Sequence, residues 1–346
     1  MKELIRIQQK LVPELIHNMQ KRYRILQKIN LMQPIGRRSL AQQMETTERI
    51  LRGEVEFLKE QGLIETEFVG MRVTDAGLQI LHYLNDVIRE IDGLKELEAR
   101  VEKLLGIPEV IIVSGDSGQD PLVKREMGYA AGRVIRERFA GGVLAVTGGT
   151  TVATVAEMIP ANQSGYAIEV LPARGGVGEN VEVQANTIAA LFAAKMGGTY
   201  RMLHIPDTLT EEAYQFFLED SSTKEYLQSL QRAHMLVHGI GQAITMAKRR
   251  GGSKELIDLL KRKGAKGEAL GYYFDEAGRV VHAMHSIGLR MNDLPNVQLI
   301  VAVAGGADKA EALLAVARGS RQDVLITDEA CAEATLRYVA KNKSGA

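Results

Sequence analysis

Short apolar runs alternate with helix-forming stretches from residue 109 to the end of the chain. Each run is short enough for a strand, and the intervening stretches are long enough for helices. Such alternation is typical of a mostly parallel sheet covered by helices on both faces. We therefore expect a doubly wound α/β domain, with strands at residues 109–113, 143–146, 167–171, 200–204, 235–238, 299–304 and 324–327 and helices at residues 121–138, 181–196, 210–217, 254–260 and 307–317.

Glycine-rich loops follow four of the predicted strands. In the first, two glycines and two threonines lead directly into a predicted helix, so that backbone N–H groups and the positive end of the helix dipole face the loop. Phosphate is the usual ligand of such a loop. The four loops contain Gly148, Gly149, Thr150 and Thr151; Arg174 and Gly175, with Gln184 beyond them; Gly239 and Gly241; and Gly305 and Gly306, with Lys309 one turn into the next helix.

Two cations in these loops suit an anionic ligand. Arg174 can hold two phosphate oxygens at once, and Lys309 supplies a point charge. Ligands of parallel α/β sheets bind at the carboxyl ends of the strands, where all four loops are expected. Arg250 is a further cationic candidate, and Glu268 is placed to accept hydrogen bonds from sugar hydroxyls. Any one of these loops, taken alone, is equally compatible with an ordinary turn.

The N-terminal residues have the pattern of a DNA-binding arm. A helical period over residues 11–29 is broken by Pro34 and Gly36, and a second helix fits residues 39–44 with Ser39 as its N-cap. A third helix, capped by Thr46 or Thr47, buries Ile50, Leu51, Val55 and Leu58 and stops near Gly62. This is the helix-turn-helix pattern, and two short strands around Gly70 make the module winged.

Positive charge gathers in this arm although the chain as a whole is neutral, with 43 basic and 43 acidic residues. Such a local excess attracts a phosphate backbone, and the first turns of a recognition helix enter the major groove. The alternative is a solvated helix face in an interaction domain. The expected DNA contacts are Arg37, Arg38, Ser39, Thr46, Thr47, Arg49 and Arg52.

An apolar stripe from Leu78 to Leu105 predicts one long helix that pairs with a second copy of itself, or else packs on its own domain. Gly106 and Pro108 end it. The expected organisation is therefore a DNA-binding domain at residues 1–77, a linker and dimerisation helix at residues 78–106, and an effector domain at residues 107–346. Two-fold proteins read two half-sites, which suits such a dimer.

The single cysteine and the absence of a long apolar run exclude several classes of protein. The lone Cys331 excludes an internal disulfide and a cysteine-based metal site, and is expected to be buried on a C-terminal helix. No apolar run reaches the roughly 20 residues that a membrane-spanning helix needs. Charged residues interrupt the N-terminus, which does not look like a signal peptide. We expect a cytoplasmic protein with no membrane partner.

With these motifs, the chain resembles the SorC group of bacterial transcriptional regulators over essentially its whole length. The resemblance rests on residues 39–62, 147–151, 174–176 and 304–309. It implies an effector domain similar to the fold of glucosamine-phosphate deaminase and ribose-phosphate isomerase, with catalysis lost. It also implies a repressor of a glycolytic operon that responds to fructose 1,6-bisphosphate, binds double-stranded operator DNA as a homodimer or tetramer, and needs no cofactor or metal. Carried over to this chain, the effector contacts are Gly148, Gly149, Thr150, Thr151, Arg174, Gly175, Gln184, Glu268 and Lys309, with Arg250 as a weaker candidate.

Two other classes of function remain open from the residues alone. A sugar-phosphate isomerase or deaminase with an appended arm would need a general base, for which Asp116, Asp120, Glu268 and the histidines at 204, 234, 238, 282 and 285 are candidates. A nucleotide-binding protein is disfavoured, because Ile244 stands where the third glycine of a dinucleotide loop would follow Gly239 and Gly241.

Overall fold

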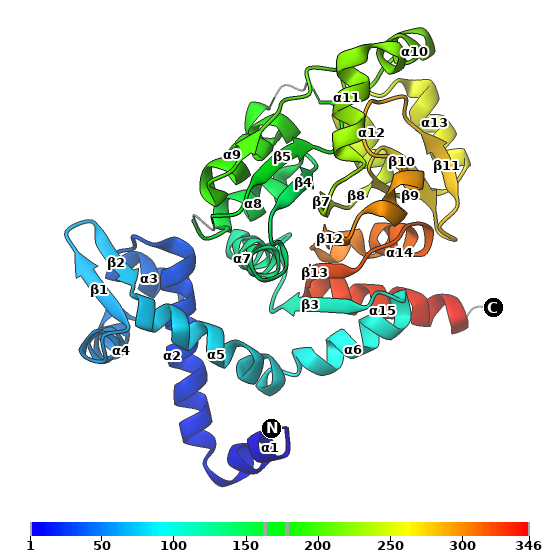
Figure 1. The fold of residues 1–346 in the computed structure, drawn as a ribbon. Helices are drawn as coiled ribbons and strands as arrows, with labels where there is room; N and C mark the ends of the chain where they lie inside the picture. Colours follow the sequence, from blue (N-terminus) through cyan, green and yellow to red (C-terminus); the bar gives the residue numbers. More distant parts are fainter. Residues whose placement is uncertain (1, 162–164, 177–179, 345–346) are drawn as a thin grey trace. The chain divides into compact units, whose positions relative to one another are not determined.

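The computed structural model describes residues 2–161, 165–176 and 180–344, and the chain divides into two compact units, Met1–Glu96 and Leu97–Ala346 (Figure 1). The first unit is mostly helical, with one hairpin, and the second is an α/β domain. Among the described residues, no helix is both long enough and apolar enough to cross a membrane.

The first unit is a winged helix-turn-helix module, as predicted. Its hairpin pairs Ile64 with Val73 in antiparallel register, and Gly70 turns at a φ of 140°. Leu26, Leu40 and Leu51 are almost fully buried where the helices meet. The elements are α1 (Lys2–Leu11), α2 (Pro13–Met32), α3 (Arg37–Gln43), α4 (Glu48–Glu60), β1 (Ile64–Glu67), β2 (Gly70–Val73) and α5 (Asp75–Ile91).

The caps of the two central helices differ in part from expectation. Ser39 does not cap α3, because the helix already begins at Arg37, with Gly36 in extended backbone as its N-cap. Thr47, rather than Thr46, caps α4: its hydroxyl oxygen accepts a hydrogen bond from the N–H of Ile50 at 3.3 Å. The predicted stop at Gly62 is confirmed, since Gly62 has a φ of 69°.

Ile50 was expected in the core, and this prediction was wrong. Its side chain is 54% exposed, whereas the adjacent Leu51 is 2% exposed. The buried face of α4 runs through Leu51, Val55 and Leu58 at spacings of four and three. Because successive residues of a helix are about 100° apart, Ile50 lies beside that stripe and faces solvent in the first full turn.

The long helix predicted for residues 78–105 is two helices. The first, α5, ends at Ile91, and α6 (Leu94–Leu105) begins after Asp92 and Gly93. Gly93 has a φ of 77°, and its N–H donates to the carbonyl of Glu90 at 3.2 Å. A glycine in this conformation ends a helix. The apolar stripe continued across the break because Ile91 and Leu94 keep a spacing of three.

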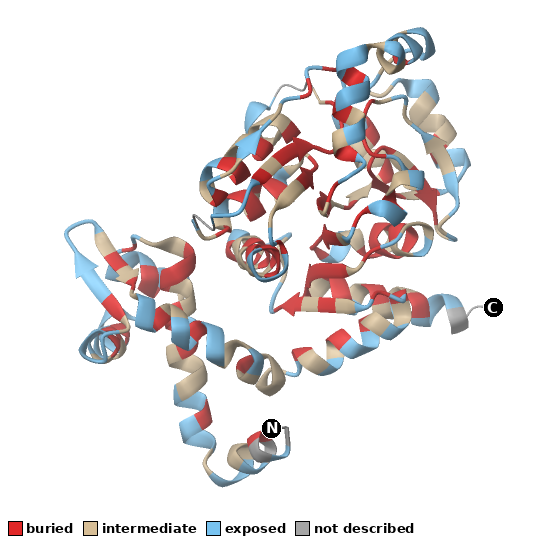
Figure 2. Ribbon diagram, viewed as in Figure 1, coloured by how far each residue is buried: buried red, intermediate tan, exposed pale blue. Residues whose placement is uncertain are grey.

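The centre of the second unit is a seven-stranded sheet in the order β3-β13-β12-β7-β4-β5-β6, with every neighbouring pair parallel. Figure 2 shows the inner strands mostly buried, as a sheet covered on both faces requires, whereas both residues of the edge strand β6 are exposed. The strands are β3 (Glu109–Val113), β4 (Gly142–Val146), β5 (Ile168–Pro172), β6 (Thr199–Tyr200), β7 (Met235–Gly239), β12 (Leu299–Val303) and β13 (Val324–Asp328).

Alternate residues of the strands pack against different helices. Leu144 and Val146 belong to one apolar cluster with α7, α8 and α9, and Ala145 belongs to another with α10 and α11. Cys331 is fully buried on α15, as predicted. The helices are α7 (Pro121–Arg138), α8 (Thr150–Met158), α9 (Ala185–Met196), α10 (Glu211–Glu219), α11 (Ser221–Leu230), α12 (Ala243–Arg249), α13 (Lys254–Arg262), α14 (Ala310–Gly319), α15 (Glu329–Ser344) and the 3₁₀ helices η1 (Val181–Val183), η2 (Met291–Asn296) and η3 (Ala307–Lys309).

A second, smaller sheet was not anticipated. It is antiparallel, in the order β11-β10-β9-β8, and comprises β8 (Gly241–Gln242), β9 (Ala265–Ala269), β10 (Tyr272–Asp275) and β11 (Val280–Ala283). The strand expected at residues 200–204 is also shorter than predicted, because only Thr199 and Tyr200 pair with β5. After Arg201 the chain instead leads through an irregular segment to α10.

Candidate functional site

The four glycine-rich loops lie at the ends of four adjacent strands. The order β12-β7-β4-β5 places Gly305, Gly239, Gly148 and Arg174 in consecutive positions along the carboxyl edge of the sheet. The threonine that opens the β4 loop joins it to its neighbour, because the hydroxyl oxygen of Thr147 accepts a hydrogen bond from the N–H of Gly239 at 3.3 Å. The predicted loops therefore form one continuous edge.

The β4 loop leads into the N-terminus of α8. Gly149 has a φ of 115° and is the N-cap residue, so Thr150 and Thr151 form the first turn. A Cβ on Gly148 would lie 2.9 Å from the carbonyl oxygen of Val183, so this position has no room for a side chain. The same contact brings the backbone of Gln184 against the loop. These four loop residues and Gln184 are thus neighbours, as the sequence predicted.

Three cations lie near this loop. Burial and the positive charges of Lys309 and Arg249 lower the pKa of Lys124, against a smaller opposite effect of Glu157, so these two cations lie within electrostatic reach of Lys124. Lys124 is in the first turn of α7, which packs on α8: a Cβ on Gly128 would be 2.8 Å from the carbonyl oxygen of Thr154. Lys124 lies one turn before Gly128 on α7, and Thr150 lies one turn before Thr154 on α8, so the two residues are at neighbouring helix starts. Among the described residues, none of the three cations forms an ion pair with a carboxylate.

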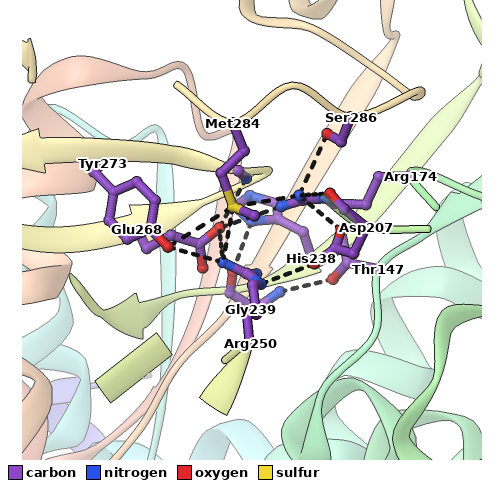
Figure 3. A network of polar contacts seen from close by, with 11 residues as sticks. Thr147, Arg174, Asp207, His238, Gly239, Arg250, Glu268, Tyr273, Met284 and Ser286 are labelled. Carbon is purple, nitrogen blue, oxygen red and sulfur yellow. Dashed lines mark hydrogen bonds and ion pairs between the residues drawn. The ribbon is translucent and has the colours of Figure 1, made fainter. Parts of the chain in front are cut away.

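Two further cations, Arg174 and Arg250, face two carboxylates in a compact group (Figure 3). Nη2 of Arg174 lies 2.7 Å from Oδ1 of Asp207, and its Nη1 lies 3.5 Å from Oε1 of Glu268. Nε of Arg250 is 2.9 Å from Oδ2 of Asp207, and its Nη1 is 3.1 Å from Oε1 of Glu268. We call these four residues the arginine–carboxylate quartet.

Arg174 is almost fully enclosed, as is Glu268. The residue is 5% exposed, and its Nη2 also contacts the hydroxyl of Ser286 at 3.3 Å and the backbone carbonyl of Asp207 at 3.4 Å. A Cβ on Gly271 would lie 2.7 Å from Nη1, so a glycine there makes room for the guanidinium group. Gly175, the next residue, donates its N–H to the carbonyl of Ile287 at 3.0 Å.

The charges of the quartet stabilise one another against burial. Burial alone would raise the pKa of Glu268, but Arg250 and Arg174 outweigh burial and lower it. Burial acts to lower the pKa of Arg250, and Glu268 and Asp207 reverse this effect and raise it. For Arg174 burial prevails and lowers the pKa, yet a guanidinium group stays protonated in proteins. The quartet is therefore neutral overall, with two positive and two negative charges.

The predicted DNA contacts lie on α3 and α4 of the first unit. Arg37, Arg38 and Ser39 are exposed on α3, and Thr47, Arg49 and Arg52 are exposed at the start of α4 and in its next turn. Thr46 is partly buried. This is the face that a winged helix-turn-helix module presents to the major groove.

Several cations of the arm already have acidic partners. Arg52 pairs with Glu56 at 2.8 Å, and Arg38 pairs with Glu48 at 3.5 Å. Lys21 and Arg22 both pair with Glu54 at 2.9 Å. Surface pairs of this kind contribute about 0–1 kcal/mol, so phosphate groups can compete for their cations. Among the residues that the structure describes, none forms an ion pair with Arg49, which leaves it the most available guanidinium group of α4.

Comparison with known proteins decides the family. A model of the sugar-binding domain (Sugar-bind) matches residues 89–337, and a model of the CggR N-terminal DNA binding domain matches residues 18–88. The central glycolytic genes regulator of Priestia megaterium (strain DSM 319 / IMG 1521) is 48% identical over 339 residues, which cover 97% of this chain and 99% of that protein. The protein of the same name from Bacillus subtilis (strain 168) is 47% identical over 338 residues, with the same coverage of both chains.

The chain belongs to the family of central glycolytic genes regulators. Among solved structures, a SorC family transcriptional regulator from Enterococcus faecalis is 39% identical, with a TM-score of 0.65 over 70% of this chain and 99% of that one. The full-length sorbitol operon regulator SorC from Klebsiella pneumoniae has a TM-score of 0.64 over 90% of this chain and 97% of that one, and at 17% identity it shows the fold alone. The predicted DNA-binding and sugar-binding halves are confirmed.

Central glycolytic genes regulators control transcription, and three of the residues considered as catalytic bases make structural contacts in this member. Asp120 caps α7 by accepting from the N–H of Leu122 at 2.8 Å, and Asp116 accepts from the N–H of Gly118 at 2.8 Å. Nε2 of His238 lies 2.7 Å from Oε1 of Gln322, and burial lowers the pKa of this histidine. Among the described residues, no group of three His, Cys, Asp or Glu could hold a metal ion.

Sequence reasoning missed two residues at the sheet edge of this regulator. Lys124 is an ordinary first-turn lysine in the sequence, and only the packing of α7 on α8 brings it near Thr150. Asp207 lies in an irregular segment before α10 and belongs to no motif. Its one sequence signal is an isolated acid after Ile205 and Pro206, which does not reveal two distant arginine partners.

Proposed function

We propose that the chain is a repressor of glycolytic genes whose hold on operator DNA is controlled by fructose 1,6-bisphosphate, bound at the carboxyl edge of the seven-stranded sheet. The bisphosphate acts as a reversible effector, and no other cofactor takes part. The observation that carries this proposal is the presence of two separate cationic groups along one edge. The first is the trio Lys124, Arg249 and Lys309, and the second is the arginine pair of the quartet.

The first phosphate fits the cationic trio and the start of α8. Lys309 and Arg249 repel the charge of Lys124 more strongly than Glu157 attracts it, and a phosphate would relieve this repulsion. The N–H groups of the first turn of α8, at Thr150 and Thr151, supply donors that favour an anion. A charge-assisted hydrogen bond contributes about 1.5–3 kcal/mol.

The second phosphate fits the arginine pair. Arg174 and Arg250 are guanidinium groups, which bind phosphate oxygens in pairs. Thr147 and Gly239 link the β4 loop to the strand end next to them, and Gly241 stands opposite Glu268 in the pairing of β8 with β9. A sugar that spans the two groups would lie along Gly148, Gly149 and Glu268, where hydroxyls meet backbone and carboxylate acceptors.

Control of DNA binding requires that the effector prefer one arrangement of the assembly. We propose that the bisphosphate changes how the effector domains of a homodimer or tetramer pack, and so alters the spacing or cooperation of the paired DNA arms. A complete shift from 1:99 to 99:1 between two arrangements takes a preference of about 10⁴-fold.

Calorimetric titration of the full chain tests the ligand. Fructose 1,6-bisphosphate is expected to bind more tightly than fructose 6-phosphate, and unphosphorylated fructose is expected not to bind. Lys309→Ala should weaken the binding of both fructose 1,6-bisphosphate and fructose 6-phosphate by about 1.5–3 kcal/mol. The matched control is Lys224→Ala, an exposed lysine on α11. If the wild-type chain binds neither fructose 1,6-bisphosphate nor fructose 6-phosphate, the proposal is excluded.

A further inference from the structure

We propose that Asp207 is an internal competitor of the effector: its carboxylate occupies the place between Arg174 and Arg250 that the second phosphate would take, and a group carrying two negative charges is needed to displace it. This inference rests on the proposed function above. It makes Asp207 the residue that distinguishes a bisphosphate from a monophosphate of the same sugar.

Charge balance requires an exchange rather than an addition. The quartet has two guanidinium and two carboxylate groups, and it is buried enough that a net charge would be costly. A phosphate added to the intact quartet would leave a net negative charge of about two. If the phosphate instead replaces Asp207, the net negative charge is only about one, and the two arginines still have oxygen acceptors for their N–H groups.

Asp207 is the carboxylate that can leave. Glu268 is held from behind, because β9 pairs with β10 and its Oε1 accepts from the N–H of Gly271 at 2.7 Å. The side chain of Glu268 is 5% exposed, whereas that of Asp207 is 22% exposed and lies on the irregular segment before α10. A ligand arriving from solvent therefore meets Asp207 before Glu268.

The hold of Asp207 on Arg174 is incomplete. Its Oδ1 is buried and close to Nη2, yet it accepts no hydrogen bond from any described residue, so the contact is an ion pair with poor alignment. Nε of Arg174 is likewise buried without a described hydrogen-bond partner. Unsatisfied buried donors and acceptors are costly. A phosphate, with more oxygens in a tetrahedral arrangement, can satisfy donors that one carboxylate leaves unpaired.

Displacement of Asp207 would reach beyond the quartet. Two residues later, the N–H of Leu209 donates to the carbonyl of His285 at 2.9 Å. Glu211 then pairs with Nε2 of His285 at 3.2 Å, and the ring of Tyr214 stacks on the same histidine. The segment from Asp207 into α10 is thus fastened to the strand end that also contacts Arg174, and release of Asp207 loosens it at one end.

A monophosphate leaves this arrangement in place. Its single phosphate binds the cationic trio, and its hydroxymethyl end carries no charge with which to compete for the two arginines. The apparent affinity for a bisphosphate, in contrast, is the intrinsic affinity multiplied by the fraction of molecules in which Asp207 has left the arginines. Removal of the carboxylate should therefore favour the bisphosphate alone.

The test is calorimetric titration of the full chain and its Asp207→Asn variant with fructose 1,6-bisphosphate and with fructose 6-phosphate. The variant should bind the bisphosphate about tenfold more tightly, while the monophosphate changes by less than about threefold. The matched control is Glu219→Gln, which removes an exposed carboxylate at the C-terminal end of α10 and should change neither affinity. Equal or weaker binding of the bisphosphate by the variant would overturn the inference.

Failure of the proposed function has a different signature, since the wild-type chain would then bind neither sugar phosphate. A second measurement covers the case in which the variant does not fold. In the wild-type chain, hydrogen exchange of the peptide that contains Leu209 should change with saturating bisphosphate and stay the same with saturating monophosphate. The same response to both ligands, or to neither, would contradict the role of Asp207.

Discussion

The carboxylate of Asp207 lies 2.7 Å from the guanidinium group of Arg174, although the two residues are 33 positions apart in the chain. Strand β5 delivers the arginine to the edge of the sheet, and the irregular segment before α10 returns to cover it. A buried pair of this kind is a weak source of net stability, but it is costly to break from one side.

Removal of Arg174 is therefore expected to destabilise the second unit strongly. In Arg174→Ala, Asp207 and Glu268 would share Arg250 alone, which leaves one buried negative charge uncompensated. The free energy of unfolding should fall by about 3–5 kcal/mol. Urea denaturation measures this, with Arg201→Ala as the control. Arg201 is one-third exposed and pairs with Glu169 at 2.7 Å, so its loss should cost at most about 1 kcal/mol. Equal effects of the two variants would count against a buried quartet.

The quartet also predicts how stability responds to acid. The two arginines lower the pKa of Glu268 below the 4.5 of an ordinary glutamate, against the effect of burial. Glu268 therefore contributes stability above pH 4.5 that is lost as the pH falls through its lowered folded-state pKa. Glu268→Gln should be less stable than wild type near pH 7, and the difference should shrink in acid. A difference that stays constant from neutral to acid pH would show that the carboxylate is not held in its charged form.

On the recognition helix, Arg49 is the cation expected to matter most for operator binding. Arg49→Ala should weaken binding by about 1–3 kcal/mol if the guanidinium group contacts a base, and by less if it contacts only phosphate. Lys59→Ala is the matched control, because Lys59 is exposed at the other end of the same helix. Fluorescence anisotropy with a labelled duplex, selected by this protein from a random-sequence library, gives both affinities. Equal losses in the two variants would indicate attraction by charge alone.

Ile50 and Leu51 separate the two faces of the same helix. Leu51→Ala should reduce the free energy of unfolding of the first unit by about 2–5 kcal/mol, because a buried leucine leaves a cavity. Ile50→Ala should change it by no more than about 0.5 kcal/mol, since the side chain is exposed. If Ile50 faces DNA, where apolar side chains contact thymine methyl groups, the same variant should lose operator affinity. Thermal unfolding and anisotropy on both variants distinguish these effects.

The sequence predicted features that local chemistry sets. The apolar runs of the parallel sheet, the glycine at Gly62 and the threonine at Thr47 all act within a few residues, so their pattern is visible in one dimension. The four loops could be assigned to strand ends for the same reason. Their adjacency in the order β12-β7-β4-β5 follows from the crossovers, which no local pattern encodes.

Features that depend on packing were missed or wrong. Ile50 matched an apolar period that Leu51, Val55 and Leu58 already satisfied, so hydropathy alone could not exclude it. Arg174 was expected to be free to bind a phosphate, whereas in the folded chain it already forms an ion pair with the carboxylate of Asp207. The sequence offered no pattern for that partner because the contact joins residues from two loops. This second outcome changes the predicted mechanism, since the effector must compete for an arginine that is already paired.

Operator binding by the full chain, titrated with fructose 1,6-bisphosphate and followed by anisotropy of a labelled duplex, tests the central claim most directly. The account predicts that the bisphosphate changes the affinity or the cooperativity of binding, and that the same concentration of fructose 6-phosphate has a smaller effect. Identical binding curves with and without the bisphosphate, at concentrations that saturate the protein in calorimetry, would contradict it.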